Sequence, residues 1–228
     1  MAFRTVKTSE EHVKDYTGDG GNYLNKSGMY EVTIKAVIVD SSPSGSEYLN
    51  LWVEYNGQEQ PIYQAMRLTN NDGSENLGAK LFTKLCVIAG ATDGAEIPDP
   101  VTRMLPMGEK GAEKECRVLE IFDDTPVYLR LQMEYGMYEG KVQERKNIRN
   151  FFRFEDKATA AEIINETEAG KQYEQELEYA DKVTLKDGLT EEDVAEWKKN
   201  RRKGDSGKKE ETKKPANGFG GKRFGNKS

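Results

Sequence analysis

Aromatic and arginine side chains alternate in the stretch KNIRNFFRF, which covers residues 146–154. As a β-strand, this stretch places Ile148, Asn150, Phe152 and Phe154 on one face and Arg149, Phe151 and Arg153 on the other. An exposed ring can stack on another planar ring, and a guanidinium binds phosphate or carboxylate oxygens through several N–H groups. The pattern therefore predicts a binding surface rather than an ordinary solvated strand.

Three other strand-like stretches repeat this pattern on the face opposite their apolar stripe. The candidate binding residues, taken together, are Tyr48, Trp52, Tyr63, Arg67, Tyr128, Arg130, Arg149, Phe151 and Arg153. Two other interpretations remain open, because a helix could cover this face and aromatic residues fit any pleated surface. A register shift of one residue would also exchange the two faces of a strand.

Residues for catalysis are scarce in this chain. His12 is the one histidine, Cys86 and Cys116 are the two cysteines, and no GxxxxGK[ST] loop occurs. The glycine cluster at 18–21 lacks the strand and helix that flank a phosphate-binding loop. The pair Asp123–Asp124 fits a metal ligand or, more often, a solvated turn. We therefore expect no enzymatic activity, no metal site and no cofactor.

The elements that position the candidate residues follow from periodicity. Alternating apolar residues predict strands over 28–42, 48–55 and 61–68, and Asn56–Gly57 predicts a tight hairpin turn between the last two. Helical spacing follows over 79–90, with Gly90 as the expected stop. Strands over 126–135 and 146–154 complete the set, while 91–125 carries no clear assignment.

Three strands, a helix and two more strands form the element order of an OB-fold, a five-stranded, partly open barrel. We therefore predict a mainly β chain with an OB-fold-like domain over 28–154 and one helix between its third and fourth strands. A flexible lead-in over 1–27 precedes this domain. An acidic helical extension over 155–203 follows it, and the Gly-, Phe- and Lys-rich stretch 204–228 predicts a disordered basic tail.

Charge is distributed unevenly along the 228 residues. Twelve Lys/Arg and three Asp/Glu give residues 198–228 a charge of +9, while the other 197 residues carry 22 basic and 37 acidic side chains, or −15. An acidic body with a basic arm differs from a uniformly basic DNA-binding domain. No stretch is apolar enough to span a membrane and Met1–Asp15 lacks a signal-peptide pattern, so we expect a cytoplasmic protein.

The segment 28–154 resembles the phage-encoded single-stranded-DNA-binding proteins, which have an OB-fold core. The resemblance lies in GMYEVTIKAVIVDSSPSGSEYLNLWVEYNG, in AKLFTKLCVIAGA and in YEGKVQERKNIRNFF before an acidic helical segment. It implies binding of single-stranded DNA without strong sequence preference during phage replication, recombination and repair, in the host cytoplasm. The basic end FGGKRFGNKS departs from the acidic tail of many such proteins, which recruits partner enzymes.

The resemblance leaves two alternatives open. A β-domain interaction or virion assembly protein could use the aromatic face to bind another protein, and a strand-annealing recombination factor would bind single strands as an oligomer. The expected partners are single-stranded DNA and phage or host replication and recombination proteins. The sequence determines neither the oligomeric state nor a preference for DNA over RNA.

Overall fold

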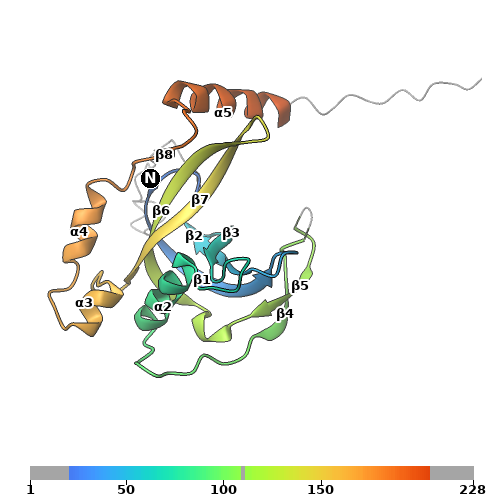
Figure 1. Ribbon diagram of the computed structural model, residues 1–228. Helices are drawn as coiled ribbons and strands as arrows, with labels where there is room; N and C mark the ends of the chain where they lie inside the picture. The colour runs from blue at the N-terminus through green and yellow to red at the C-terminus, as the bar shows by residue number, and fades with distance from the viewer. Residues whose placement is uncertain (1–20, 109–110, 206–228) are drawn as a thin grey trace, which may run out of the picture. The chain divides into compact units, whose positions relative to one another are not determined.

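The computed structural model describes residues 21–108 and 111–205 (Figure 1). The chain divides into two compact units, one ending at Gly188 and the other beginning at Leu189. This division falls inside the segment 155–203, which the sequence predicts as one helical extension. Most of the lead-in and nearly all of the basic tail lie outside the described residues.

The first unit is built on a strand-rich antiparallel sheet with helices. Its strands are β1 (Gly28–Ser41), β2 (Glu47–Tyr55), β3 (Gln58–Arg67), β4 (Val101–Leu105), β5 (Lys114–Val118), β6 (Thr125–Tyr138), β7 (Lys141–Arg153) and β8 (Thr184–Leu185). The order is β3-β2-β1-β5-β4, and β6 pairs with β1, β7 and, in parallel, β8. The five strands expected from the sequence are β1, β2, β3, β6 and β7.

Strand β1 organises this sheet because it pairs along both of its edges. One edge pairs with β2, while the other pairs with β6 over Gly28–Ile34 and with β5 at Ile38 and Val39. Strands β3 and β7 contact each other but form no ladder, so the described strands do not close into a barrel.

The core fills the space inside the curved sheet. Its fully buried members include Ile34, Leu49, Leu51, Ile62, Met66, Leu85, Phe122, Leu129 and Phe151. A β-bulge at Lys35 then changes which face of β1 points inward. Beyond it, Ala36 and Ile38 belong to a second apolar cluster with Leu105, Cys116 and Val118 of the β4–β5 hairpin.

The region between β3 and β6 is more elaborate than the sequence predicts. Helix α2 (Leu77–Ile88) lies at the expected place, with the Asn76 side chain accepting from the Gly78 N–H at its start. The β4–β5 hairpin and the short helix η2 (Glu120–Phe122) then intervene before β6. The expectation of a single helix between the third and fourth strands therefore omits a hairpin, whose five-residue strands are too short to show clear alternation.

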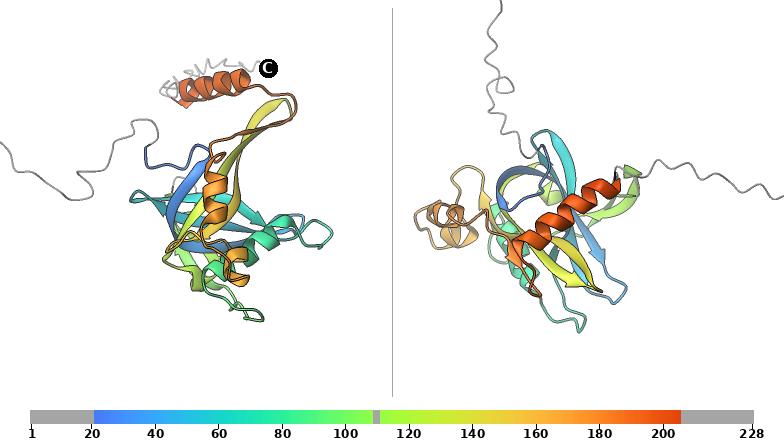
Figure 2. Two further views of the ribbon diagram at one scale, coloured as in Figure 1. Left: turned by 90° about the vertical axis from the view of Figure 1, so that its left-hand side faces the viewer. Right: turned by 90° about the horizontal axis from the view of Figure 1, so that it is seen from above.

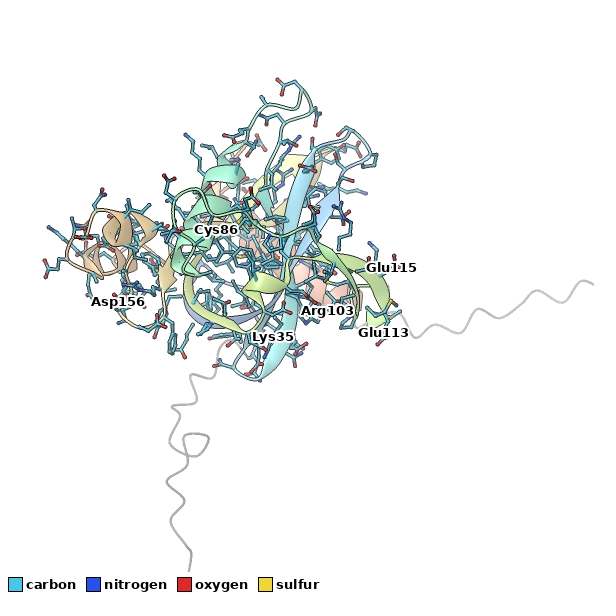
Figure 3. All side chains as sticks on the ribbon, turned by 90° about the horizontal axis from the view of Figure 1, so that it is seen from below. Lys35, Cys86, Arg103, Glu113, Glu115 and Asp156 are labelled. Atoms are coloured by element: carbon cyan, nitrogen blue, oxygen red, sulfur yellow. The ribbon has the colours of Figure 1, made fainter. Side chains whose placement is uncertain are left out.

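Ion pairs fix this hairpin to β1 and account for the aspartate pair. The Arg103 guanidinium binds the Asp123 carboxylate and also donates to the Lys35 carbonyl at 2.9 Å. Arg103 and Lys35 lie next to each other (Figure 3). The Lys35 amine lies 2.8 Å from Asp124 and 3.3 Å from Glu54. Both aspartates thus have cationic side-chain partners, and no cluster suited to a metal ion occurs in the described part of the chain.

Helices α3 (Ala160–Ile164) and α4 (Lys171–Leu177) lie along one side of β6 and β7 (Figures 1 and 2). A capping box begins α3, since Thr159 accepts from the Glu162 N–H and Glu162 accepts from the Thr159 N–H. The second unit contains α5 (Glu191–Asp205), where Thr190 and Asp193 form the same reciprocal pair. None of these helices, within the described ranges, is long and apolar enough to cross a bilayer.

Candidate nucleic-acid interface

The outer face of β2 and β3 retains three of the predicted binding residues. Tyr48 is the cross-strand partner of Arg67, so both side chains lie on the same face. Tyr63 follows the core residue Ile62 on β3 and is 60% exposed. A bulge around Gln64, whose φ of 48° is left-handed, separates Tyr63 from Arg67. This surface therefore combines an open ring, a half-buried ring and a guanidinium.

Arg67 is held in place by neutral groups. Its Nε donates to the Thr69 carbonyl at 3.1 Å, and its Nη2 donates to Ser46 Oγ at 2.8 Å and Asn71 Oδ1 at 2.6 Å. Among the described residues, no carboxylate lies within ion-pair distance, and Nη1 has no hydrogen-bond partner. The guanidinium is therefore oriented in advance and keeps N–H groups for an anionic ligand.

Two loops and α2 support this guanidinium. Asn71 Oδ1 also accepts from Ser46 Oγ at 2.6 Å, so the loops after β1 and β3 are joined beneath the same arginine. The first turn of α2 presses on the β3 backbone: a Cβ on Gly78 would lie 2.1 Å from the Arg67 carbonyl oxygen. Only glycine permits this approach, which fixes the end of β3.

Tyr48 lies beside Asp40 at the edge of this surface. Burial raises the pKa of the Tyr48 phenol above its ordinary value, and the neighbouring Asp40 carboxylate raises it further. A tyrosine phenol is protonated at neutral pH even at its ordinary pKa, so the ring is neutral there. A neutral, partly exposed ring suits stacking better than a charged one would beside an acidic group.

The expectation that Trp52 is an exposed stacking residue is wrong. Its side chain is 8% exposed and packs in the apolar cluster beneath the β4–β5 hairpin. The indole N–H donates to Glu59 Oε2 at 2.7 Å, so its polar group is satisfied as well. Trp52 does lie on the predicted face of β2, but the hairpin that the sequence does not reveal covers it.

The expectation for Phe151 is wrong because β7 contains a bulge. Ladder pairing shifts between Arg130 and Leu131 of β6, so that Arg149 becomes an extra residue in β7. The residues of β7 after this bulge therefore point to the opposite faces from those that regular alternation predicts. Phe151, opposite Leu129, is fully buried in the core, and Phe152 takes the outer position that the alternation assigns to Phe151.

Helix α4 covers much of the outer face of β6 and β7. The Phe152 and Tyr173 rings meet edge to face at 5.2 Å between centroids, and Tyr128 lies between Tyr173 at 5.5 Å and the stacked ring of Phe154 at 5.8 Å. The Tyr128 hydroxyl also donates to Glu31 at 3.1 Å. Tyr128 is therefore a half-buried packing residue of this face rather than an open ring.

The three arginines predicted on β6 and β7 differ in whether an acidic side chain neutralises their charge. Arg130 Nη1 lies 3.0 Å from Glu176 Oε2, and its guanidinium sits 4.7 Å from the Tyr179 ring centre. The expectation that Arg153 lies on the outer face is also wrong, because after the bulge it pairs with the core residue Val127. Its guanidinium forms two bonds to the Asp156 carboxylate, at 2.9 and 2.6 Å. Arg149 is exposed and donates only to Gln132 Oε1, at 2.6 Å. Of these three, Arg149 alone keeps an uncompensated charge.

Two further cations extend from Arg149 along β7. Lys141 and Arg145 are exposed, occupy alternating outer positions with Gln143, and have no ion-pair partner among the residues described. The exposed Tyr138 lies opposite Lys141. We call Lys141, Arg145 and Arg149 the β7 cation row. The sequence analysis missed Lys141 and Arg145, although the alternation in KVQER carries the signal.

The predicted residues thus divide between two surfaces. Tyr48, Tyr63 and Arg67 lie on β2 and β3, Arg149 belongs to the β7 cation row, and β1 separates β2 from β6 in the pairing order. Both cysteines are buried free thiols, and burial raises the pKa of Cys86 to about 11, so this thiol is a poor nucleophile. No protein-family model and no curated protein sequence matches this chain.

Proposed function

We propose that the first unit is an elaborated OB-fold formed by β1, β2, β3, β6 and β7. In support, β1 pairs with both β2 and β6, and α2 follows β3 as the helix of that fold does. The β4–β5 hairpin is then an insertion between the helix and the fourth strand. The open contact between β3 and β7 corresponds to the incompletely closed side of such a barrel.

On this fold, the chain binds single-stranded DNA without strong sequence preference. The observation that carries this proposal is Arg67, an oriented guanidinium with free N–H groups beside two tyrosines. Unpaired bases expose their faces and can stack on Tyr63 and Tyr48, while Arg67 contacts phosphate. Phosphate contacts and stacking carry little base information, which accounts for the sequence tolerance.

The β7 cation row supplies additional phosphate contacts. Successive members are four positions apart, which corresponds to about 13 Å along an extended strand. Neutral Gln143 and Asn147 lie between them, so no carboxylate interrupts the row on β7 itself. The two surfaces together fit a polyanion followed over several nucleotides rather than a single bound phosphate.

The biological role that follows is protection of single strands during phage DNA replication, recombination and repair. This part of the proposal is supported by the resemblance over 28–154 and by the chemistry of the two surfaces. Replication and recombination proteins of the phage or its host are the corresponding partners. The acidic body limits binding to surfaces where cations are exposed. Glu134, the cross-strand partner of Arg145, is itself paired with Lys186, at 2.8 Å.

Fluorescence anisotropy with dye-labelled oligo-dT tests the proposal. Replacing Tyr63 with Ala should cost about 1–3 kcal/mol of binding free energy, the range for loss of one stacked base. Arg67→Ala should lower the dependence of log K on log salt by about 0.7, the value for one single-strand phosphate. Tyr23→Ala is the matched control, since Tyr23 is 58% exposed and lies outside these strands.

Two results would contradict the proposal. If oligo-dT does not bind the wild-type protein at low salt, the proposal that the chain binds single-stranded DNA is wrong. If a folded Tyr63→Ala/Arg67→Ala double variant binds oligo-dT as the wild type does, the β2–β3 surface does not contact DNA. A salt-insensitive complex with another protein would instead favour the interaction-protein alternative.

A further inference from the structure

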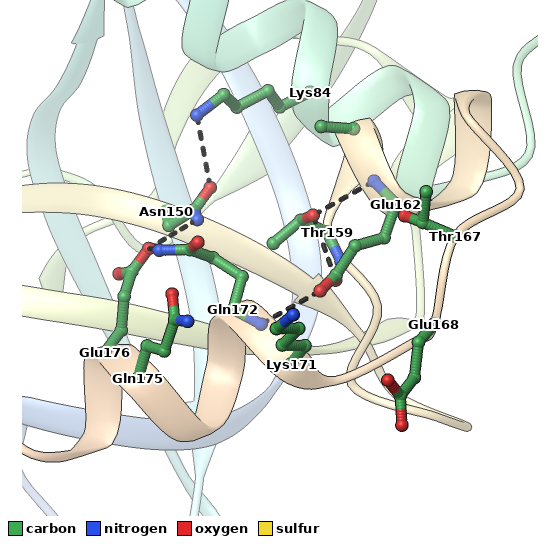
Figure 4. A pocket seen from close by; sticks show the side chains of 11 residues that line it. Lys84, Asn150, Thr159, Glu162, Thr167, Glu168, Lys171, Gln172, Gln175 and Glu176 are labelled. Atoms are coloured by element: carbon green, nitrogen blue, oxygen red, sulfur yellow. Dashed lines mark hydrogen bonds between the residues drawn. The ribbon is translucent and has the colours of Figure 1, made fainter.

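A cavity of about 550 Å³ lies where α2, β7, α3 and α4 meet (Figure 4). This volume falls within the range of pockets that bind small organic ligands, about 300–1,000 Å³. Three of its lining residues are polar and more than nine-tenths buried: Asn150, Thr159 and Glu176. The cavity therefore has an ordered polar floor, and it is distinct from the β2–β3 surface.

Hydrogen bonds already engage two of the three carboxylates that line the cavity. Glu176 accepts from Arg130 on one oxygen and from Asn150 and Gln172 on the other, at 2.9–3.1 Å. Glu162 accepts from the backbone and hydroxyl of Thr159 on one oxygen and from the Gln172 N–H on the other. The third, Glu168, points away from Asn150 (Figure 4).

Free hydrogen-bond donors remain around the same cavity. The Lys84 amine has one long contact, 3.4 Å to Asn150 Oδ1, and the Lys171 amine has no partner in the described part of the chain. Neither lysine forms an ion pair with a described carboxylate. Lys171 is also the first residue of α4, where a positive charge does not stabilise a helix. The charged lining groups that no described ion pair engages are thus two ammonium groups, Lys84 and Lys171, and one carboxylate without a hydrogen-bond partner, Glu168.

We infer that this cavity binds a phosphate-bearing ligand of mononucleotide size. The Lys84 and Lys171 ammonium groups bind the phosphate through charge-assisted hydrogen bonds. Gln175 and Thr167, which also line the cavity and make no side-chain hydrogen bond among the described residues, contact the sugar or base. Such a ligand has two sources, a free nucleotide or the phosphorylated end of a DNA strand.

Nuclear magnetic resonance titration tests this site directly. Thymidine 5′-monophosphate should shift the side-chain amide resonances of Asn150, Gln172 and Gln175, whereas thymidine at the same concentration should not. The Lys84→Gln/Lys171→Gln variant should bind the nucleotide at least about tenfold more weakly, because it loses both charge-assisted hydrogen bonds to the phosphate. Lys80→Gln, an exposed lysine of α2 outside the cavity lining, should bind normally.

Equal shifts with thymidine and its monophosphate, or no shifts at millimolar nucleotide, would overturn the inference. So would unchanged nucleotide affinity in the double variant. Should that variant unfold, Lys171→Gln alone decides, because the Lys171 side chain makes no hydrogen bond or ion pair with a described residue. Inorganic phosphate should compete with the nucleotide for the two ammonium groups.

Matched oligonucleotides distinguish the two sources of the ligand. A 5′-phosphorylated oligo-dT that shifts the amide resonances more than its 5′-hydroxyl form identifies a strand end, and equal shifts identify a free nucleotide. The Arg67→Ala variant should bind thymidine monophosphate normally. The test of nucleotide binding in the cavity is thus independent of the test of DNA binding on the β2–β3 surface.

Discussion

Loss of the Glu176 carboxylate should destabilise the first unit strongly. Side-chain exposure is 12% for Arg130 and 9% for Glu176, so the pair is largely removed from water. The carboxylate accepts three hydrogen bonds, from Arg130, Asn150 and Gln172. Arg130 Nε is already buried without a partner. Glu176→Ala therefore leaves a buried guanidinium uncompensated, at a cost of about 3–5 kcal/mol.

Replacement of both partners provides the matched comparison. An Arg130→Met/Glu176→Leu variant removes the buried charges together and should recover most of the lost stability, because apolar residues of similar volume replace buried ion pairs well. Urea unfolding of the wild type, Arg130→Met, Glu176→Leu and the double variant gives the coupling free energy. Hydrogen exchange then shows whether α4 opens locally before the sheet unfolds.

A loss below about 1 kcal/mol for Glu176→Ala would refute this reasoning. Such a value is typical of surface ion pairs and would mean that water reaches Arg130 once the carboxylate is removed. A double variant less stable than either single variant would also contradict it, since the pair would then contribute more than two apolar side chains can.

Four further outcomes are expected. Phe151→Ala should cost about 3–5 kcal/mol in urea unfolding, because the ring is fully buried, whereas Phe154→Ala should cost less at 38% exposure. The Arg153 guanidinium lowers the pKa of Asp156 below 3.8 in the folded state. The unfolded state therefore binds more protons at acidic pH than the folded state, and the free energy of unfolding should fall as pH drops below about 4. Asp156→Asn should flatten this pH dependence. Cys86 should resist thiol reagents at pH 8 in the folded protein, with urea as the control that exposes it. Truncation after Trp197 removes the +9 arm and should slow DNA association in stopped-flow measurements, less so at high salt; an unchanged rate at low salt would exclude the arm.

Alternation of apolar residues was enough to predict the five main strands. It worked for β2, where Leu49, Leu51 and Val53 are all fully buried, because period two holds as long as pairing is regular. The hairpin turn at Asn56–Gly57 was equally clear, and both residues have positive φ. Helix α2 followed from spacing alone, with its end near Gly90.

Bulges account for the errors in assigning faces. The bulges fall at Lys35 and Arg149, which are neither glycine nor proline, so the sequence does not indicate them. Each bulge exchanges the two faces of the part of the strand that follows it. Tyr63 and Arg67 were placed on the surface correctly because the irregularity between them adds two residues to β3, which leaves the alternation of faces unchanged. Trp52 and Tyr128 depended on what covers them, and single-strand periodicity does not contain that information.

The double pairing of β1 has a consequence for how the chain folds. β1, β2 and β3 are joined by short turns and can assemble as a meander soon after they are synthesised. The first half of β1, however, pairs with β6, and Gly28 pairs with Leu131. This pairing forms late, because it closes a long loop that contains the whole intervening chain. Until then, this half of β1 presents an open edge to other chains. Aggregation during synthesis should therefore be greatest for nascent chains that end before Leu131.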